Sequence, residues 1–283
     1  MDDTGFRTDK DKPTITLGGI ELATPAQKIN RFSCMIWGSS GSGKTTLAST
    51  APGDLLWINF DPDGTDAIAY RDNVLVMDYA NEPDRCVEKF KEADPLRITQ
   101  FLIDHPKIQT VVFDSLTTFG NKALSHGVVK AAGTAKGRGA TLENPGYGGY
   151  GNKNTWTHLA VTRLLEATGK VGRNVIFIAH EDKPVTNSEG SVLYISIMLG
   201  SSLNEQVPVK LSEIWNLTDT GKERRIAIRA CRARKPMKSR MFLNSDDPEF
   251  VWNYNAETDK GEGIAEWIEQ WKANGGKKIP LPK

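Results

Sequence analysis

Short apolar runs alternate with helix-like segments through the first 180 residues. Two of these runs, at 32–37 and 108–116, have the apolar character of strands buried on both faces of a parallel sheet, and five runs in all predict strands. They span residues 32–37, 54–60, 73–79, 108–116 and 174–180. Helical spacing predicts helices between them, at 45–50, 82–94, 95–106 and 154–170. This alternation predicts an α/β fold whose mostly parallel, twisted sheet carries helices on both faces.

The pattern changes in two later stretches. Residues 128–153 hold seven glycines between Gly133 and Gly151, which predicts a long mobile loop before a helix capped by Asn154 or Thr155. After residue 191 the apolar positions alternate, and two short runs flank the turn at 218–223 as in a hairpin. We therefore expect the C-terminal strands to add an antiparallel edge to the sheet.

Three parts follow from this pattern: an N-terminal arm over 1–30, a core over 31–243, and an acidic tail over 244–283. The tail ends in a short predicted helix, and its apolar positions lie on one side. These positions are Ile264, Trp267, Ile268 and Trp271. We expect this side of the helix to dock on the core or on a neighbouring subunit.

Composition narrows the class of protein only slightly. The chain has 283 residues and a formal net charge of +1, so its bulk charge indicates neither a nucleic acid nor a membrane partner. Locally, residues 221–240 hold nine Lys or Arg and one Glu, a net of +8 that leaves about −7 for the rest. The three cysteines have no disulfide or metal spacing, which favours a reducing cytoplasm. The charged N-terminus predicts no signal peptide, and no apolar run is long enough for a membrane span.

The stretch "GSSGSGKT" at 38–45 follows the first buried strand and opens a predicted helix. It fits G-x-x-x-x-G-K-[ST], the pattern of a phosphate-binding loop, in the context that the loop requires. Backbone N–H groups and the helix dipole would hold phosphate oxygens, Lys44 would reach the β- and γ-phosphates, and Thr45 would bind Mg²⁺. The predicted ATP-binding residues are Gly38, Ser39, Ser40, Gly41, Ser42, Gly43, Lys44, Thr45 and Thr46.

Polar residues end three of the other apolar runs, where ligands bind in open α/β sheets. Asp114 follows "TVVF" and is our second Mg²⁺ ligand beside Thr45. Asp61 or Asp63 would orient the attacking water, with Asp61 preferred, although a "DPDG" turn would select Asp without any catalytic role. His180 would hydrogen-bond the γ-phosphate and report its loss. A strand-end histidine bonded to backbone is the alternative for this residue.

Four stretches, "GSSGSGKTT", "NFD", "VVFDSLTTF" and "VIFIAH", occur in the order and spacing that resemble the RecA-like ATPase core. The details are most similar to the small phage-encoded ATPases of the Sak type, which act in single-strand annealing and recombination. Asp61 falls where the family places a catalytic Glu, and His180 falls where it usually places Gln. The resemblance implies Lys44, Asp61, Asp114 and His180 as catalytic residues.

The resemblance also implies self-association into a ring or filament and contact with single-stranded DNA. Arg232 and Arg234 resemble the cations that reach a neighbour's nucleotide in trans. Basic and aromatic side chains would hold the strand by phosphate contacts and stacking. The predicted DNA-binding residues are Lys130, Lys136, Arg138, Tyr147, Tyr150, Lys153, Lys235 and Lys238. The residues between Lys130 and Lys153 could instead belong to a flexible surface loop. The basic residues after 221 could instead belong to a solvated edge strand.

The sequence thus predicts a Mg²⁺-dependent ATPase acting on single-stranded DNA in phage-type recombination, in the cytoplasm of a bacterial host. A single-strand DNA-binding protein is a further candidate partner. Two alternatives stay open: a ring-forming motor of the helicase type, and a nucleotide-gated interaction protein without DNA binding. A small-molecule kinase is disfavoured because no Arg-rich lid is found.

Overall fold

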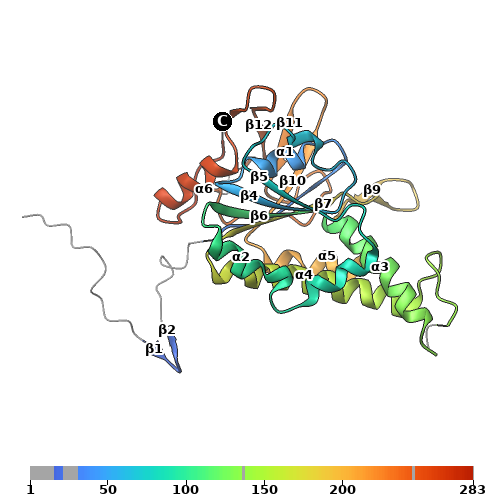
Figure 1. Cartoon of the computed structure of the whole chain (residues 1–283). Helices are drawn as coiled ribbons and strands as arrows, with labels where there is room; N and C mark the ends of the chain where they lie inside the picture. Colours follow the sequence, from blue (N-terminus) through green and yellow to red (C-terminus); the bar gives the residue numbers. More distant parts are fainter. Residues whose placement is uncertain (1–15, 22–30, 136–137, 244–245, 283) are drawn as a thin grey trace, which may run out of the picture.

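The computed structural model describes residues 16–21, 31–135, 138–243 and 246–282. An eight-stranded sheet forms its centre, with strand order β12-β11-β10-β3-β7-β6-β4-β5 (Figure 1). In chain order the strands are β3 (Ser33–Gly38), β4 (Asp54–Asn59), β5 (Val74–Asp78), β6 (Ile108–Asp114), β7 (Asn174–His180), β10 (Glu213–Asp219), β11 (Arg224–Ala227) and β12 (Glu249–Trp252).

The six neighbouring strands β10, β3, β7, β6, β4 and β5 are parallel. Strands β11 and β12 continue the sheet beyond β10 in antiparallel pairing. The predicted α/β fold with an antiparallel C-terminal edge is therefore confirmed. Since the parallel strands run in one direction, their carboxyl ends share one edge of the sheet. This edge receives the loops that follow β3, β4, β6, β7 and β10, which is the usual position of a ligand site.

Helices cover both faces of the sheet (Figure 1). One face carries α1 (Lys44–Ser49) and α6 (Ile264–Ala273), and the other carries α2 (Ile98–Asp104), α3 (Leu116–Ala132), α4 (Gly146–Lys170) and α5 (Ser201–Gln206). The 3₁₀ turns are η3 (Asp66–Ile68), η4 (Asp84–Lys91), η5 (Pro95–Arg97) and η6 (Pro208–Lys210). The described residues also form three small hairpins: β1 (Thr16–Leu17) with β2 (Ile20–Glu21), β8 (Val185–Thr186) with β9 (Val192–Tyr194), and β13 (Tyr254–Asn255) with β14 (Lys260–Gly261).

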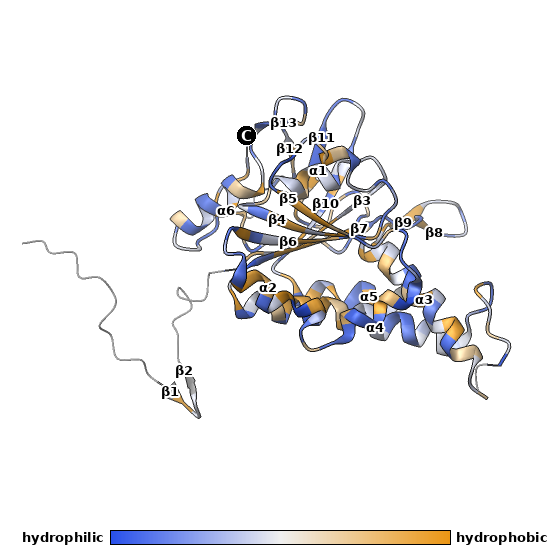
Figure 2. Ribbon diagram, viewed as in Figure 1, coloured by the Kyte–Doolittle hydropathy of each residue, from blue (hydrophilic) through white to orange (hydrophobic). Residues whose placement is uncertain are grey.

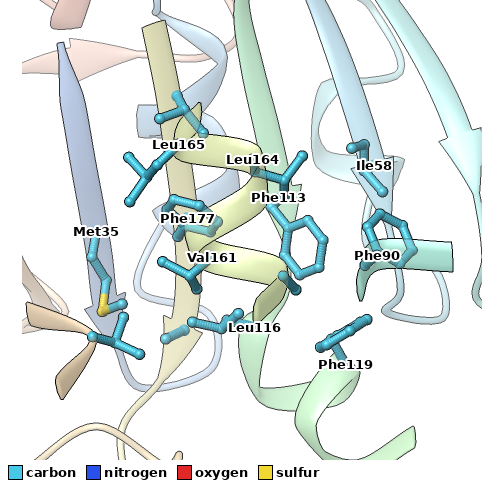
Figure 3. Close-up of a cluster of buried hydrophobic side chains, with 14 of the residues drawn as sticks. Met35, Ile58, Phe90, Phe113, Leu116, Phe119, Val161, Leu164, Leu165 and Phe177 are labelled. Carbon is cyan, nitrogen blue, oxygen red and sulfur yellow. The ribbon is translucent and has the colours of Figure 1, made fainter. Parts of the chain in front are cut away.

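Alternation along each central strand divides the core between the two faces. In β3, Met35 and Trp37 pack with α2 to α5, whereas Cys34 and Ile36 pack with α1 and α6. Figure 3 shows the first of these clusters, in which aromatic rings from β6, η4 and α3 meet. Figure 2 shows the same division as apolar residues gathered between the sheet and its helices. Burial on both faces explains the continuous apolar runs of the central parallel strands, whereas the edge strand β5 leaves Leu75 and Val76 about half exposed.

The prediction of a loop over 128–153 is wrong for half of its length, because only residues 133–145 lie between the two helices. Helix α3 continues to Ala132, and α4 begins at Gly146 rather than at a cap near Asn154 or Thr155. Two glycines at the start of α4 are packing positions: a Cβ on Gly148 would meet Ala131 at 2.9 Å, and one on Gly149 would meet Val128 at 3.0 Å. Close helix–helix contact thus offsets the helix-breaking tendency of these glycines, about 1 kcal/mol each.

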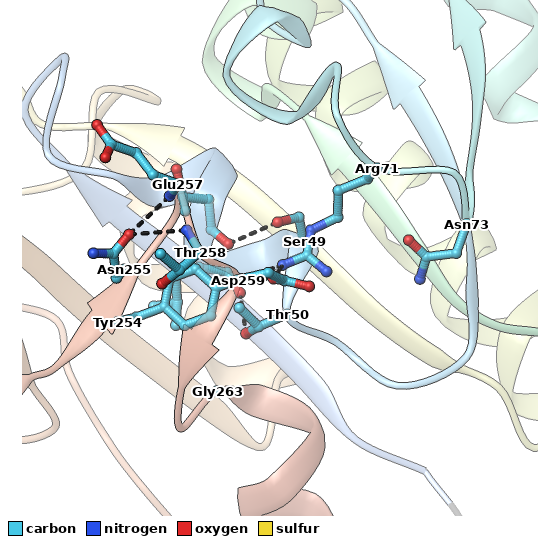
Figure 4. Close-up of polar contacts among 12 residues, drawn as sticks. Ser49, Thr50, Arg71, Asn73, Tyr254, Asn255, Glu257, Thr258, Asp259 and Gly263 are labelled. Atoms are coloured by element: carbon cyan, nitrogen blue, oxygen red, sulfur yellow. Dashed lines mark hydrogen bonds and ion pairs between the residues drawn. The ribbon is translucent and has the colours of Figure 1, made fainter.

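The C-terminal part of the chain is joined to the sheet. Strand β12 pairs with β11, so the sheet extends beyond residue 243. Helix α6 buries Trp267 against Trp215 and other rings of the core, so the predicted docking of this helix on the core is confirmed. Its first turn is tied to α1, because the Ile264 N–H donates to the Thr50 hydroxyl at 2.9 Å. Figure 4 shows this region and the neighbouring ion pair of Arg71 with Asp259, 2.6 Å apart.

The strand predicted after residue 191 forms only in part. The strand β9 contains three residues, and the following segment makes isolated bridges instead of a ladder. One bridge joins Ile195 to Arg234, and another joins Glu181 to Ile197. These bridges fix the segment that follows β7 against the basic stretch near residue 234.

Candidate active site

The loop from Gly38 to Lys44 connects β3 to α1 at the carboxyl edge of the sheet. Gly41 and Gly43 have φ values of +76° and +95°, which only glycine adopts without strain. Gly38 is required for another reason, because a Cβ there would overlap the carbonyl oxygen of Leu217 on β10. The predicted helix start and the predicted strand before it are both present, so the motif has the local structure of a phosphate-binding loop.

Lys44 is buried within this loop. Its Nζ donates to the Ser39 carbonyl oxygen at 2.6 Å, so the side chain lies back across the loop. Burial lowers the pKa of Lys44, and the carboxylates of Asp114 and Asp61 oppose that shift. The hydroxyl of Ser42 is buried and unpartnered among the described atoms. An ammonium and a free hydroxyl in one glycine-rich turn suit an anion with several oxygens.

The polar residues at the strand ends meet beside this loop, as the sequence predicted. The hydroxyl of Thr45 donates to Oδ2 of Asp114 at 3.3 Å. Nε2 of His180 and Oδ2 of Asp61 are 3.1 Å apart, and the Ser115 hydroxyl donates to Oδ1 of Asp61 at 3.1 Å. Because an ionised carboxylate only accepts hydrogen bonds, His180 is the donor to Asp61. The pairing joins the ends of β4 and β7 across β6.

The two carboxyl groups differ in their electrostatics. Burial and the negative charge of Asp61 raise the pKa of Asp114 to about 7. Burial would also raise the pKa of Asp61, but hydrogen bonds from His180 and Thr118 lower it below its ordinary value. Asp61 is therefore ionised at neutral pH, and positive charge added beside Asp114 would favour its ionised form.

A cavity of about 580 Å³ lies over these residues. Its wall includes Lys44, Asp61, Asp114 and His180, together with Asp63. Asp63 lines the cavity and has a φ of +54°, in the left-handed region that is typical of turns. The sequence did not single out one further wall residue, Arg224 of β11, although it lies in the basic stretch noted above. The volume of this cavity is in the range of small-molecule binding sites.

The donor set at Thr45 and Asp114 fits Mg²⁺ bound together with a nucleotide. Such sites use one or two protein oxygens, and phosphate and water supply the other ligands. Among the residues that the structure describes, no group of three His, Cys, Asp or Glu forms a separate metal cage. A divalent cation beside Asp114 would also favour the ionised form of its carboxyl group, whose pKa is otherwise about 7.

Of the residues predicted to bind DNA or to act in trans, those that the structure describes are not part of the cavity wall. Lys130 pairs with Glu88 at 2.9 Å, Lys153 is half-buried on α4, and Lys136 falls outside the described residues. Arg138 and Tyr147 line one hollow at the end of the α3–α4 pair, where Tyr147 is fully exposed and Tyr150 is 53% exposed.

The basic residues after β11 lie apart from that end. Lys235 lies over the ring of Tyr194 at 4.7 Å, and Lys238 pairs through its backbone with Ile214. Arg232 and Arg234 are each paired within the chain. Arg232 contacts Glu249 at 2.5 Å, and Arg234 contacts Glu181 at 3.0 Å.

The fold and the loop define a P-loop nucleoside triphosphatase whose mostly parallel sheet fits a RecA-like core. A family model described as an AAA domain matches residues 30–245, and the chain belongs to this family. Membership indicates a nucleotide-binding ATPase. A search of curated proteins gives no match. Among the described residues, the structure has no helix that is both long and apolar enough to span a membrane.

Proposed function

We propose that this chain hydrolyses ATP with Mg²⁺ in the cavity at the P-loop, with Asp61 aligning the attacking water. The pairing of Asp61 with His180, 3.1 Å apart, supports this proposal most directly. It brings a carboxylate and a hydrogen-bond donor from two strands to the side of the P-loop where Asp114 also lies. The residues of the P-loop would hold the phosphates, and Thr45 and Asp114 would hold Mg²⁺.

The same pairing suggests how the site responds to its nucleotide. Nε2 of His180 is occupied by Asp61. A γ-phosphate oxygen would compete for this N–H, and the exchange would release Asp61 to accept a hydrogen bond from water. Mg²⁺, when bound, neutralises charge on the phosphates. Catalysis is then positioning and charge stabilisation, as is usual for phosphoryl transfer.

Single-stranded DNA is the proposed partner, in recombination of the phage Sak type. The α3–α4 pair projects beyond the sheet in Figure 1, and Tyr147 and Tyr150 are exposed near its end. Exposed aromatic rings beside Arg138 suit a strand held by stacking and phosphate contacts. Lys130 and Lys153 are held by neighbouring parts of the chain, so we place the main contacts at the tyrosines. Arg232 and Arg234 remain our proposed trans cations in an assembled ring or filament.

A second candidate is a nucleotide-gated interaction with another protein. Val129 and Leu142, near the same end of the helix pair, are 72% and 62% exposed. Apolar side chains gathered at one exposed end are typical of a protein contact. These two side chains suit a protein partner as an alternative to DNA at that end, and the experiment below separates the two.

The test is ATP hydrolysis with and without single-stranded DNA at low salt, where phosphate contacts are strongest. Wild type should be stimulated by DNA, and Lys44→Ala should lose hydrolysis. The double variant Tyr147→Ser/Tyr150→Ser should lose stimulation but keep basal hydrolysis. The matched variant Tyr147→Phe/Tyr150→Phe keeps the rings and should keep stimulation. Hydrolysis that needs Lys44 but ignores DNA would support the protein-partner candidate. Absence of hydrolysis under every condition would contradict the catalytic proposal.

A further inference from the structure

Arg224 is a cation of the same chain that lies directly against the P-loop. A Cβ built on Gly43 would lie 3.1 Å from Nε and 3.2 Å from Cζ of Arg224. The guanidinium therefore packs against the turn that begins α1. Arg224 also lines the cavity that holds Lys44 and Asp61. Its side chain is 34% exposed, so one face of the guanidinium is open to the cavity and to solvent.

The sheet fixes this position. Strand β10 pairs in parallel with β3, so its carboxyl end lies beside the start of the P-loop. The turn after Asp219 reverses the chain, and β11 begins at Arg224 directly beside that edge. Nε of Arg224 lies 3.4 Å from Oδ2 of Asp219, which is a long and partly exposed ion pair. Such a pair contributes little stability and is readily exchanged for a better anion.

The strand order indicates which part of a nucleotide Arg224 would meet. Asp61, Asp114 and His180 end strands on one side of β3, and Arg224 starts a strand on the other side. If the γ-phosphate lies at the carboxylates, the α- and β-phosphates extend toward β11. Arg224 also borders a second cavity of about 530 Å³, whose wall includes Trp252 and Tyr254. The nucleoside thus has space beyond Arg224.

We propose that Arg224 binds the α- and β-phosphates of the nucleotide in cis, and that these phosphates replace Asp219 as its partner. The inference rests on the proposed function and assigns one more residue to that site. A guanidinium forms paired hydrogen bonds with phosphate oxygens, which an ammonium cannot reproduce. Arg224 is a ground-state binding residue here, because ADP carries the same two phosphates as ATP.

Arg224→Ala and Arg224→Lys test the proposal, with Arg225→Ala as the matched control. Arg225 is the next residue of β11, so its side chain leaves the opposite face of the strand, where it pairs with Glu223 and with Glu249. Affinities for ADP and ATP are measured by calorimetry, and kcat is measured at saturating ATP. Arg224→Ala should weaken both nucleotides by about 10- to 100-fold, the effect of a lost charged hydrogen bond, and leave kcat within about threefold. Arg224→Lys should recover part of the loss, and Arg225→Ala should match wild type.

Three results would overturn the inference. In the first, Arg224→Ala binds ADP as tightly as wild type, but Lys44→Ala does not. Arg224 is then not part of the nucleotide site, and the ATPase proposal is unaffected. A fall in kcat with unchanged ADP affinity would instead place Arg224 at the γ-phosphate. Wild type that binds neither ADP nor ATP would contradict the proposed function and this inference together. Circular dichroism melting of each variant shows whether the fold is retained.

Discussion

Replacing Asp61 by Asn removes the carboxylate that the structure places between His180 and Ser115. The change is nearly isosteric, and the hydrogen bonds that Asp61 accepts from His180 and Ser115 are each 3.1 Å long. An amide oxygen can still accept from either partner but carries no charge and is a poor acceptor for a proton of water. Asp61→Asn therefore removes the charge proposed to align the attacking water, while it keeps the shape of the site.

The expected magnitudes differ for catalysis and for folding. A positioned general base contributes about 10²- to 10⁴-fold, so kcat should fall by that range. Charged hydrogen bonds contribute about 1.5–3 kcal/mol each, but Asn keeps weaker versions of them. The loss is further offset because the charge of Asp61 raises the pKa of Asp114, and this repulsion disappears. We expect the free energy of unfolding to change by about 1–2 kcal/mol at most.

The assay is single-turnover hydrolysis, with nucleotide affinity measured separately. Asp61→Asn should bind ATP at least as tightly as wild type, because one negative charge beside the phosphates is removed. Asp63→Asn is the matched control, since Asp63 lines the same cavity without contacting His180. A variant Asp61→Asn that hydrolyses ATP at the wild-type rate, with Asp63→Asn inactive, would refute the assignment of the water-aligning carboxylate.

Three further predictions concern the frame of the site and the core. Gly38→Ala should lower the unfolding free energy by about 1–3 kcal/mol and weaken ATP binding, because its Cβ would displace the Leu217 carbonyl; denaturant titration and calorimetry measure the two effects. Trp267→Ala should cost about 3–5 kcal/mol in the same titration, since this ring is 1% exposed. The ion pair with Lys130 holds the pKa of Glu88 at about 2, below its usual 4.5. Its stabilisation, screened to about 1 kcal/mol or less, is present above pH 4.5 and is lost as pH falls toward 2, so the melting temperatures of Glu88→Gln and wild type should converge on acidification.

The parallel half of the fold could be predicted because burial on both faces leaves a direct mark on the sequence. The predicted run at 174–180 coincides with β7, and the run at 108–116 contains β6 (Ile108–Asp114). The P-loop could be predicted because the conformation of a single turn determines where its glycines and Lys44 occur in the sequence. The carboxyl ends of parallel strands share one edge of the sheet. The sequence alone could therefore predict that Asp61, Asp114 and His180 lie near one another.

The remainder depends on contacts between distant parts of the chain. The glycine-rich start of α4 is helical because Gly148 and Gly149 pack against α3, which no local propensity reveals. Arg224 was one of nine cations in a basic stretch, and only the pairing of β10 with β3 selects it. The direct hydrogen bond between Asp61 and His180 could not be predicted, because it depends on how far the ends of β4 and β7 extend relative to each other. A sequence pattern does not give these positions.

The two proposed trans cations differ in what each would give up to reach a neighbouring subunit. Arg232 is 54% exposed, and solvent screens its pairing with Glu249, so breaking that pair costs about 1 kcal/mol or less. Arg234 and Glu181 are only 21% and 15% exposed, so their hydrogen-bonded pair is worth more. Glu181 also follows His180 directly, and losing Arg234 would leave a poorly solvated carboxylate next to the proposed γ-phosphate sensor. Arg232 can therefore serve a neighbour at little cost, whereas Arg234 would have to weaken its own subunit's site to do so.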